Sequence, residues 1–299
     1  MDTGILLESG TNELEILEFN IGNNHYGINV AKVKEIMSYQ PPTPVPNAHP
    51  SIEGIFMPRD TIISIVDLAK SLSIPPSTDP KRDMYIITNF NKLNIGFHVH
   101  GVEGIHRLTW EDISKPDETI STAQSSVATG IIKLDGRLIV VLDFEKIVTD
   151  ISPETGLKVT DIEKLGARTR NSSPILIAED SPLLSKLIVD SLHKAGYVNV
   201  DANSDGLEAW NKISKYKEDG TLKEKVHCII TDIEMPQMDG HRLTKLCKDD
   251  PEIHDIPIVI FSSLINDEMR RKGESLGADA QLTKPEIGSL VEVIDKLIL

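Results

Sequence analysis

The fold of this chain is decided by the stretch Cys228–Gly240, which reads Cys-Ile-Ile-Thr-Asp-Ile-Glu-Met-Pro-Gln-Met-Asp-Gly. The apolar run from Val226 to Ile230 leads to Asp232, and Pro and Gly residues then turn the chain away. An unbroken apolar run bounded by turn residues is typical of a strand buried on both faces of a parallel sheet. Such sheets hold functional groups beyond the carboxyl ends of their strands, where Asp232 would lie. Taken alone, Asp232 is better interpreted as a polar residue that ends a strand.

Three other apolar runs have the same form and also end in polar side chains. They are Ile175–Ala178, Ile256–Phe261 and Ala280–Thr283, followed by Glu179 and Asp180, by Ser262 and Ser263, and by Lys284. Helical patterns separate the runs, and this alternation of strand and helix predicts a parallel α/β sheet. Because parallel strands bring their carboxyl ends to one edge, we expect Asp232 and these polar side chains to gather there.

The charges expected at that edge favour a bound cation. Two carboxylates about 4 Å apart repel each other by roughly 4 kcal/mol at an effective dielectric constant of about 20. Three crowded carboxylates must take up protons or hold a cation, and Mg²⁺ prefers such oxygen ligands. A phosphoryl group arriving there would meet the metal, the Lys284 ammonium and the Ser262 hydroxyl, which stabilise negative charge during phosphoryl transfer. Asp232 would then be the nucleophile that carries the acyl phosphate.

The order of these residues resembles that of response-regulator receiver domains, over about Pro174–Leu299. That family has an acid pair after the first strand, a phosphorylated Asp after the third, a Thr or Ser after the fourth and Lys-Pro after the fifth. The resemblance implies a flavodoxin-like (βα)5 fold, with Asp232 as the phosphorylation site and Ser262 and Lys284 in catalysis and switching. A receiver catalyses only its own phosphoryl transfer and dephosphorylation, so we do not expect a classical enzyme.

The same resemblance implies a Mg²⁺ site. Asp180 and Asp232 would ligate the ion directly, the backbone carbonyl of Glu234 would be a third ligand, and Glu179 would hold a metal-bound water. Two positions depart from the family pattern. Gln281 stands where receivers usually carry an aromatic residue, so a switch through such a ring is not available. The side chain of Glu234 lies beside the phosphorylation site, where it would hinder or orient an attacking water.

The composition bears on several classes of function. The 299 residues suffice for about two domains. A formal net charge of −15, from 46 acidic and 31 basic residues, disfavours nucleic acid and anionic lipid as partners. Cys228 and Cys247 lack metal or redox spacing and are interpreted as small buried residues in a reducing compartment. With no signal-peptide pattern and no apolar stretch of membrane-spanning length, we expect a cytoplasmic protein without direct membrane insertion.

The sequence pattern of the first part of the chain predicts short strands. Leu14–Ile21 alternates, Gly22–Asn24 predicts a turn, and His25–Val30 follows as the hairpin partner. Many further short strands with regular turns predict an all-β domain of one or two small barrels. Within it we expect a helical turn or short helix over Ala31–Met37 and turns at Gly101–Gly104.

Three histidines in this part raise the alternative of a metal site. His98 and His100 fall on one face of a strand, and His106 is near them in the sequence. No Cys or carboxylate stands at a typical ligand spacing, and a structural zinc site needs four ligands. We therefore favour ordinary strand histidines.

The order of the short strands resembles that of CheW-like chemotaxis adaptor domains. The segments that carry the resemblance are Val45–Pro46, Ile52–Leu68, Ile95–Ile105 and Asp135–Glu145. Members of that family form two small five-stranded barrels and bridge chemoreceptors to the histidine kinase. By this resemblance Val33, Glu35 and Arg59 lie where such adaptors contact their partners. A purely structural role for these residues is given the same weight as partner contact. In that case Val33 lies in the core, Glu35 lies on the solvated surface, and Arg59 is a turn residue that holds carbonyl groups.

The two resemblances divide the chain into parts. We expect an adaptor domain over residues 12–165, with a closing helix at Leu157–Leu165. An exposed linker is expected over residues 166–173, because these residues are small and polar and show no periodic pattern of apolar side chains. A receiver domain is expected over residues 174–299. Lys217–Lys225 is interpreted as a charged, solvated loop within the receiver.

An adaptor followed by a receiver is the arrangement of CheV-type chemotaxis coupling proteins. This resemblance implies a scaffold at chemoreceptor arrays that couples the receptor tips to the histidine kinase, with coupling modulated by phosphorylation of Asp232. The phosphoryl group must then favour one conformational state over another. An alternative is a phosphate sink that drains phosphoryl groups from the kinase and is localised by its adaptor domain. A transcriptional regulator is disfavoured by the acidic charge and the lack of a basic helix-turn-helix pattern.

Overall fold

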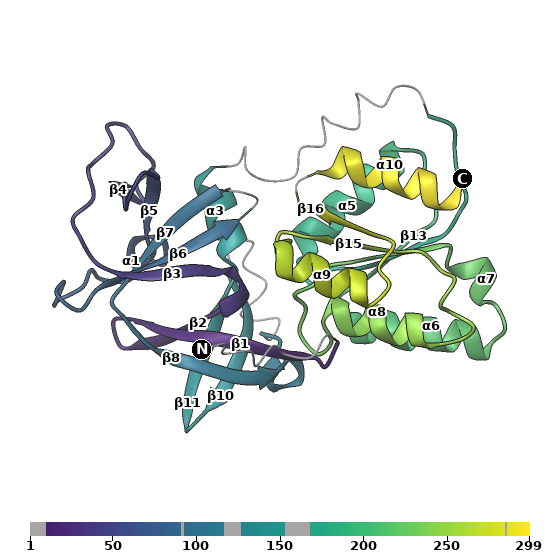
Figure 1. Cartoon of the computed structure of the whole chain (residues 1–299), viewed down its shortest axis with the longest axis horizontal. Coiled ribbons are helices and arrows are strands. Elements are labelled where there is room, and N and C mark those ends of the chain that lie inside the picture. Colours follow the sequence, from purple (N-terminus) through teal and green to yellow (C-terminus); the bar gives the residue numbers. More distant parts are fainter. Residues whose placement is uncertain (1–9, 91–92, 117–126, 153–167, 285) are drawn as a thin grey trace. The chain divides into compact units, whose positions relative to one another are not determined.

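The computed structural model describes residues 10–90, 93–116, 127–152, 168–284 and 286–299 (Figure 1). The chain divides into two compact units: one consists of Leu14–Leu108 and Asp112–Pro153, and the other includes the carboxy-terminal residues from 168 onward. Among the described residues, no helix is both long enough and apolar enough to cross a membrane.

The amino-terminal unit is all-β, with one sheet for each expected barrel. Its strands are β1 (Glu13–Ile21), β2 (Asn24–Asn29), β3 (Val33–Ser38), β4 (Ile52–Phe56), β5 (Ile63–Asp67), β6 (Met84–Phe90), β7 (Leu93–Val99), β8 (Gly101–Thr109), β9 (Ile113–Ser114), β10 (Ala128–Leu134) and β11 (Arg137–Leu142). The six-stranded sheet has the order β8-β1-β2-β11-β10-β9, and the five-stranded sheet has the order β3-β6-β7-β5-β4. The short helices α1 (Leu68–Ser71) and α3 (Phe144–Ile151) follow β5 and β11.

Local pattern explains most of these strands but not all of them. The β1–β2 hairpin is confirmed, with Leu17 opposite Ile28. Of the two alternatives for Ala31–Met37, the short helix is wrong: a single 3₁₀ turn over Val30–Lys32 is followed by β3, which pairs antiparallel with β6. The turns expected at Gly101–Gly104 are also wrong, because these residues begin β8. Both segments pair with strands that are distant in the sequence, β3 with β6 and β8 with β1, and local periodicity does not report such pairing.

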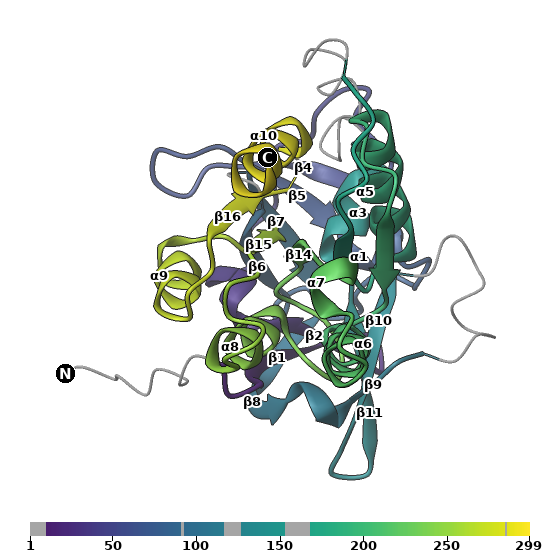
Figure 2. The same cartoon turned by 90° about the vertical axis from the view of Figure 1, so that its right-hand side faces the viewer.

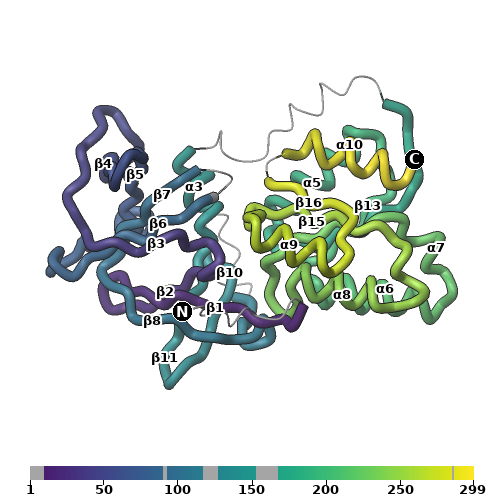
Figure 3. Tube along the Cα trace, viewed as in Figure 1, coloured from purple at the N-terminus to yellow at the C-terminus, as the bar shows by residue number. Residues whose placement is uncertain are grey.

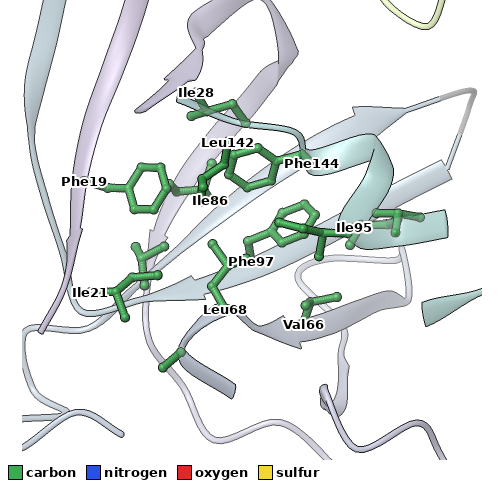
Figure 4. Packing of buried hydrophobic residues seen from close by; sticks show 14 of the residues in the cluster. Phe19, Ile21, Ile28, Val66, Leu68, Ile86, Ile95, Phe97, Leu142 and Phe144 are labelled. Atoms are coloured by element: carbon green, nitrogen blue, oxygen red, sulfur yellow. The ribbon is translucent and has the colours of Figure 1, made fainter. Parts of the chain in front are cut away.

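One hydrophobic core joins the two sheets (Figure 4). Phe19, Ile21 and Ile28 come from the six-stranded sheet and face side chains of β5, β6 and β7. Phe144, the first residue of α3, packs edge-on against Phe97, with ring centroids 4.7 Å apart. Since one cluster draws on both sheets, the two sheets form one domain.

The carboxy-terminal unit has the parallel sheet that the apolar runs predict. Its strands are β12 (Ile175–Ala178), β13 (Val200–Asn203), β14 (Cys228–Thr231), β15 (Ile258–Ser262) and β16 (Ala280–Thr283), in the order β13-β12-β14-β15-β16. All neighbouring pairs are parallel. The helices are α5 (Pro182–Lys194), α6 (Gly206–Glu218), α7 (Leu222–Lys225), α8 (Gly240–Asp249), α9 (Asp267–Ser275) and α10 (Ile287–Ile298). The fold is flavodoxin-like.

Helices cover both faces of this sheet (Figures 1 and 2). Ile175 and Ile177 point toward α5 and α10, whereas Leu176 and Ala178 point toward α6 and α8. The expected loop over Lys217–Lys225 is instead the end of α6 and the short helix α7, which buries Leu222. Strands buried on both faces account for the unbroken apolar runs.

The residues expected to form an exposed linker are in part bound to the carboxy-terminal unit. Arg168 donates from Nε to the carbonyl of Ala195, and its guanidinium lies 2.5 Å from Asp295 in α10. Asn171 forms a parallel bridge with Tyr197. Figure 3 shows this segment running beside the carboxy-terminal end of α10. The expected helix at Leu157–Leu165 lies outside the described residues.

Candidate functional site

Strand pairing brings the predicted acidic residues together. Ala178 at the end of β12 lies opposite Thr231 at the end of β14, so the next residues, Glu179 and Asp232, are neighbours. The backbone N–H of Asp232 donates to the carbonyl of Ala178 at 3.0 Å, which fixes the register at this point. Ligand oxygens of Glu179, Asp180 and Asp232 all lie within 4.8 Å of one another.

Lys284 completes this cluster from the end of β16. Its Nζ atom lies 2.7 Å from Oε2 of Glu179 and 2.9 Å from Oδ2 of Asp232. The other oxygen of Asp232, Oδ1, accepts a hydrogen bond from the backbone N–H of Ile233 at 2.6 Å. Both carboxylate oxygens of Asp232 therefore have fixed donors, and the side chain is held in one orientation.

The cluster is almost completely withdrawn from solvent. Only 3% of Glu179, 8% of Asp232 and 4% of Lys284 is exposed. Burial raises the pKa of Glu179 to about 7; the Lys284 ammonium lowers it, and the Asp232 carboxylate raises it further. Two buried acids sharing one buried ammonium form a site with a strong demand for additional positive charge.

Two residues of the following loop support the site, and the sequence analysis did not single them out. Asp239 caps α8 by accepting a hydrogen bond from the N–H of Arg242 at 2.6 Å, and burial raises the pKa of Asp239 to about 6. A Cβ atom on Gly240 would lie 1.9 Å from the carbonyl oxygen of Asp232. Only glycine lets the backbone at position 240 come so close to the carbonyl group of Asp232. The Asp-Gly pair at 239–240 was therefore the sequence signal for this close contact.

The remaining predicted residues lie at or near the same edge of the sheet. Ser262 ends β15, is 1% exposed, and accepts a hydrogen bond through Oγ from the N–H of Leu264 at 3.2 Å. Glu234 is half-buried in the loop after β14. Gln281 is buried within β16 and donates to the carbonyl of Arg270 in α9.

The predicted adaptor residues are divided between core and surface. Val33, at the start of β3, packs against the hydrophobic core. Glu35, two residues further along β3, lies 3.8 Å from the guanidinium of Arg59. Arg59 follows β4, its side chain is 86% exposed, and its φ is +60°. Non-glycine residues rarely adopt this left-handed conformation, and such outliers are a reasonable starting point for a functional hypothesis.

Two family models match the chain: the CheW-like domain over residues 15–152 and the response regulator receiver domain over residues 175–295. Chemotaxis protein CheV3 of Helicobacter pylori is 32% identical over 96% of this chain and 95% of its own length. The chain belongs to the CheV family of chemotaxis proteins.

Chemotaxis protein CheV1 of Helicobacter pylori also matches along the chain, with 26% identity over 96% of this chain and 94% of its own length. Some other relatives match one domain only. Chemotaxis protein CheW of Thermotoga maritima is 30% identical over 50% of this chain and 98% of its own length. Among solved structures, the scaffolding protein TtCheW from Thermoanaerobacter tengcongensis has 25% identity and a TM-score of 0.41, covering 44% of this chain and 84% of that one. Vibrio cholerae CheY4 has 25% identity and a TM-score of 0.36, covering 42% of this chain and 99% of that one.

The histidines of the CheV adaptor domain have separate partners. His98 lies between Glu53 and Asp83, with Nδ1 and Nε2 at 2.8 and 2.9 Å from their carboxylates. His106 contacts the fully buried Glu18, and His100 accepts a hydrogen bond from the N–H of Gly22. Within the described ranges, the group of side chains close enough to hold a metal is the receiver trio of Glu179, Asp180 and Asp232.

The receiver trio fits a hard divalent cation. Three carboxylates offer oxygen ligands within a small space, which is the chemistry that Mg²⁺ requires. Lys284 neutralises part of the charge, but one ammonium does not balance three carboxylates. Asp180 is the least buried of the three.

Proposed function

We propose that this CheV protein is a cytoplasmic scaffold at chemoreceptor arrays, and that phosphorylation of Asp232 modulates its coupling of receptors to the histidine kinase. The observation that supports this most directly is the convergence of Glu179, Asp180, Asp232 and Lys284 from three strand ends. The adaptor domain supplies the scaffold, and the receiver domain supplies the phosphorylated site.

The residues of the receiver prepare one carboxylate for phosphoryl transfer. Asp232 attacks the phosphorus of the donor, a new bond forms to its carboxylate oxygen, and the bond from phosphorus to the leaving group breaks. The N–H of Ile233 and the Lys284 ammonium orient the carboxylate before the attack. Mg²⁺, when held by Asp180, Asp232 and the backbone carbonyl of Glu234, with Glu179 orienting a bound water, supplies positive charge for the transferring group. The Ser262 hydroxyl then donates a hydrogen bond to an oxygen of the transferred phosphoryl group.

On the adaptor domain we assign partner contact to Arg59 and Glu35. Arg59 is exposed on the loop between β4 and β5, and its ion pair with Glu35 is long, at 3.8 Å. Exposed apolar side chains flank it on this loop, with Met57 61% and Ile62 65% exposed. An arginine surrounded by apolar surface is typical of a residue that anchors an interface. Val33, which packs against the core at the start of β3, is the third residue proposed for partner contact.

The phosphorylation part is tested by labelling with a small phosphodonor and Mg²⁺, followed by mass spectrometry. We expect one phosphoryl group on Asp232, and none in Asp232→Asn or without Mg²⁺. Asp201→Asn, which changes an acid on the β13 edge of the same domain, should label normally. Labelling that persists in Asp232→Asn would show that the acceptor is a different residue.

The coupling part is tested by co-sedimentation of receptor, kinase and this protein, with and without beryllium fluoride as a phosphoryl mimic. We expect the amount of bound protein or the kinase activity to change with the mimic. The phosphate-sink alternative predicts instead that Asp232→Asn couples normally and that the wild type releases phosphate rapidly. Identical coupling in all samples would contradict modulation by phosphorylation.

A further inference from the structure

The side chain of Gln281 is a buried link between β16 and helix α9. Gln281 is 9% exposed, and its Nε2 atom donates to the carbonyl oxygen of Arg270 at 2.7 Å. Its Oε1 atom is buried and accepts no hydrogen bond from the part of the chain that the structure describes. A buried acceptor without a donor is destabilising, so among the described residues the hydrogen bond that favours this position of the amide is the one to Arg270.

Helix α9 carries a glycine at the point where the Gln281 amide lies against it. A Cβ atom on Gly273 would lie 2.4 Å from Oε1 and 2.6 Å from Cδ of Gln281. Gly273 is buried in the last turn of α9, and glycine within a helix costs about 1 kcal/mol relative to alanine. The missing side chain makes room for the Gln281 amide, which lies against this part of the helix.

The other end of α9 is connected to the candidate phosphorylation site. Ser262 accepts from the N–H of Leu264, and the short loop from Ser263 to Asn266 then leads directly into α9. Asn266 caps the helix by accepting from the N–H of Met269 at 2.9 Å. If the Ser262 hydroxyl turns toward a phosphoryl group, its bond to Leu264 is lost, and the start of α9 is free to shift.

We propose that Gln281 is a positioning residue that holds α9 in its unphosphorylated place, and that phosphorylation of Asp232 releases this hydrogen bond. The inference rests on the proposed function. Helix α9 is then fixed at two points, the Ser262–Leu264 bond at its start and the Gln281–Arg270 bond along its side. Loss of the Ser262–Leu264 bond weakens the Gln281–Arg270 bond, because both bonds require the same position of the helix.

Thermodynamic linkage gives a test that a purely structural contact would not satisfy. If binding of a phosphoryl mimic breaks the Gln281 bond, part of the binding free energy is used to break it. A variant that lacks the bond does not have this cost, so its affinity for the mimic should be higher by the equilibrium constant that the bond contributes. One hydrogen bond corresponds to about a two- to tenfold change in an equilibrium constant. We therefore expect Gln281→Leu to bind beryllium fluoride, in the presence of Mg²⁺, about two- to tenfold more tightly than the wild type.

Hydrogen exchange of the α9 peptides provides the second measurement on the full chain. Beryllium fluoride with Mg²⁺ should speed exchange in α9 of the wild type. Gln281→Leu should show faster exchange in α9 before any addition. Gly273→Ala should do the same, because its new Cβ displaces the amide. Tyr197→Phe is the matched control: it removes a buried side-chain hydrogen bond to Asp295 in α10, and it should change neither α9 exchange nor affinity.

The outcomes separate the two levels of the proposal. Wild-type exchange and affinity in both Gln281→Leu and Gly273→Ala would overturn the inference. It would also be overturned if the mimic protected the loop around Asp232 in the wild type without altering α9. If the mimic produced no change even around Asp232, the proposed function itself would fail, and the release step would fail with it.

Discussion

The ammonium of Lys284 lies 2.9 Å from Oδ2 of Asp232, and both side chains are more than nine-tenths buried. The same ammonium also pairs with Glu179 at 2.7 Å. A buried cation shared by two buried acids is tightly constrained, because loss of either partner leaves charge without compensation. We therefore expect Lys284 to be needed for the stability of the domain as well as for the proposed phosphoryl transfer.

Lys284→Met should destabilise the receiver domain by about 3–5 kcal/mol in the absence of divalent ions. The variant should regain much of this stability when Mg²⁺ is added, since the ion then supplies the missing positive charge. Urea denaturation with and without Mg²⁺ measures both effects. Lys212→Met is a suitable control, because Lys212 pairs with Asp201 at a partly exposed site and contributes at most about 1 kcal/mol. An equal Mg²⁺ response in Lys284→Met and wild type would contradict this account.

Gly240→Ala should damage the phosphorylation site without touching a charged group. The added Cβ would lie 1.9 Å from the carbonyl oxygen of Asp232, so the loop after β14 must move. We expect a loss of about 2 kcal/mol or more in unfolding free energy, as in other overpacked sites, and slower labelling of Asp232. In Gly104→Ala the new Cβ meets no atom within 4 Å, so this variant should keep wild-type labelling. Normal labelling of Gly240→Ala would show that the loop tolerates displacement.

The stability of the adaptor domain should depend on pH through His98. Burial alone would lower the pKa of His98, but hydrogen bonds to Glu53 and Asp83 outweigh this effect, and the pKa is raised. Its contribution to stability is therefore complete below the unfolded-state pKa of about 6.5 and is lost as the pH rises through the folded-state value. Burial raises the pKa of Glu53, but bonds from His98 and Tyr39 lower it overall, so that carboxylate titrates only at lower pH.

Comparison with His98→Gln isolates this contribution. Near pH 6 the variant should be less stable than the wild type by about 2 kcal/mol, the usual size for hydrogen bonds to a charged group. The difference should shrink as the pH rises and His98 loses its proton. Denaturation across the pH range measures it, with His49→Gln as the control for loss of an exposed histidine. A difference that does not change with pH would mean that His98 is not charged in the folded protein.

Arg59→Ala should weaken binding of the adaptor domain to its partner without affecting folding. An exposed ion pair contributes at most about 1 kcal/mol, so the 3.8 Å contact to Glu35 adds little stability. Alanine and arginine have the same conformational free-energy cost at a φ of +60°, so the substitution does not change the strain of the backbone. We expect about tenfold weaker binding to the kinase or receptor in calorimetry, with normal Asp232 labelling. Arg82→Ala removes a similarly exposed arginine, paired with Asp79, and should bind normally.

The receiver domain was largely predictable from sequence because its central strands are buried on both faces. Unbroken apolar runs identified β12, β14, β15 and β16, and the residues after them were predicted to meet. The edge strand β13 was not predicted, since Val200–Asn203 alternates with polar residues and has one neighbouring strand. Gln281 was recognised as unusual, but its bond to Arg270 depends on the position of α9, which no local pattern specifies.

The adaptor domain was predictable only as a class. Its alternating strands indicated an all-β fold, but the first four residues of β8, Gly101–Gly104, were interpreted as turns because of their two glycines. The pairs that fix its sheets join distant parts of the chain. Arg137 donates two hydrogen bonds to Glu18, 119 residues away, and His98 contacts Glu53, 45 residues away. Sequence spacing carries no information about such contacts.

The binding of Arg168 to Asp295 bears on how such proteins can be recombined. A chimaera that joins this receiver to a foreign adaptor at residue 174 would discard Arg168 and the bridge at Asn171. It would leave Tyr197 and Asp295 without their guanidinium neighbour, at the end of the last helix. Fusion junctions should therefore be placed before residue 168, so that the transplanted module keeps the short peptide on which its final helix depends.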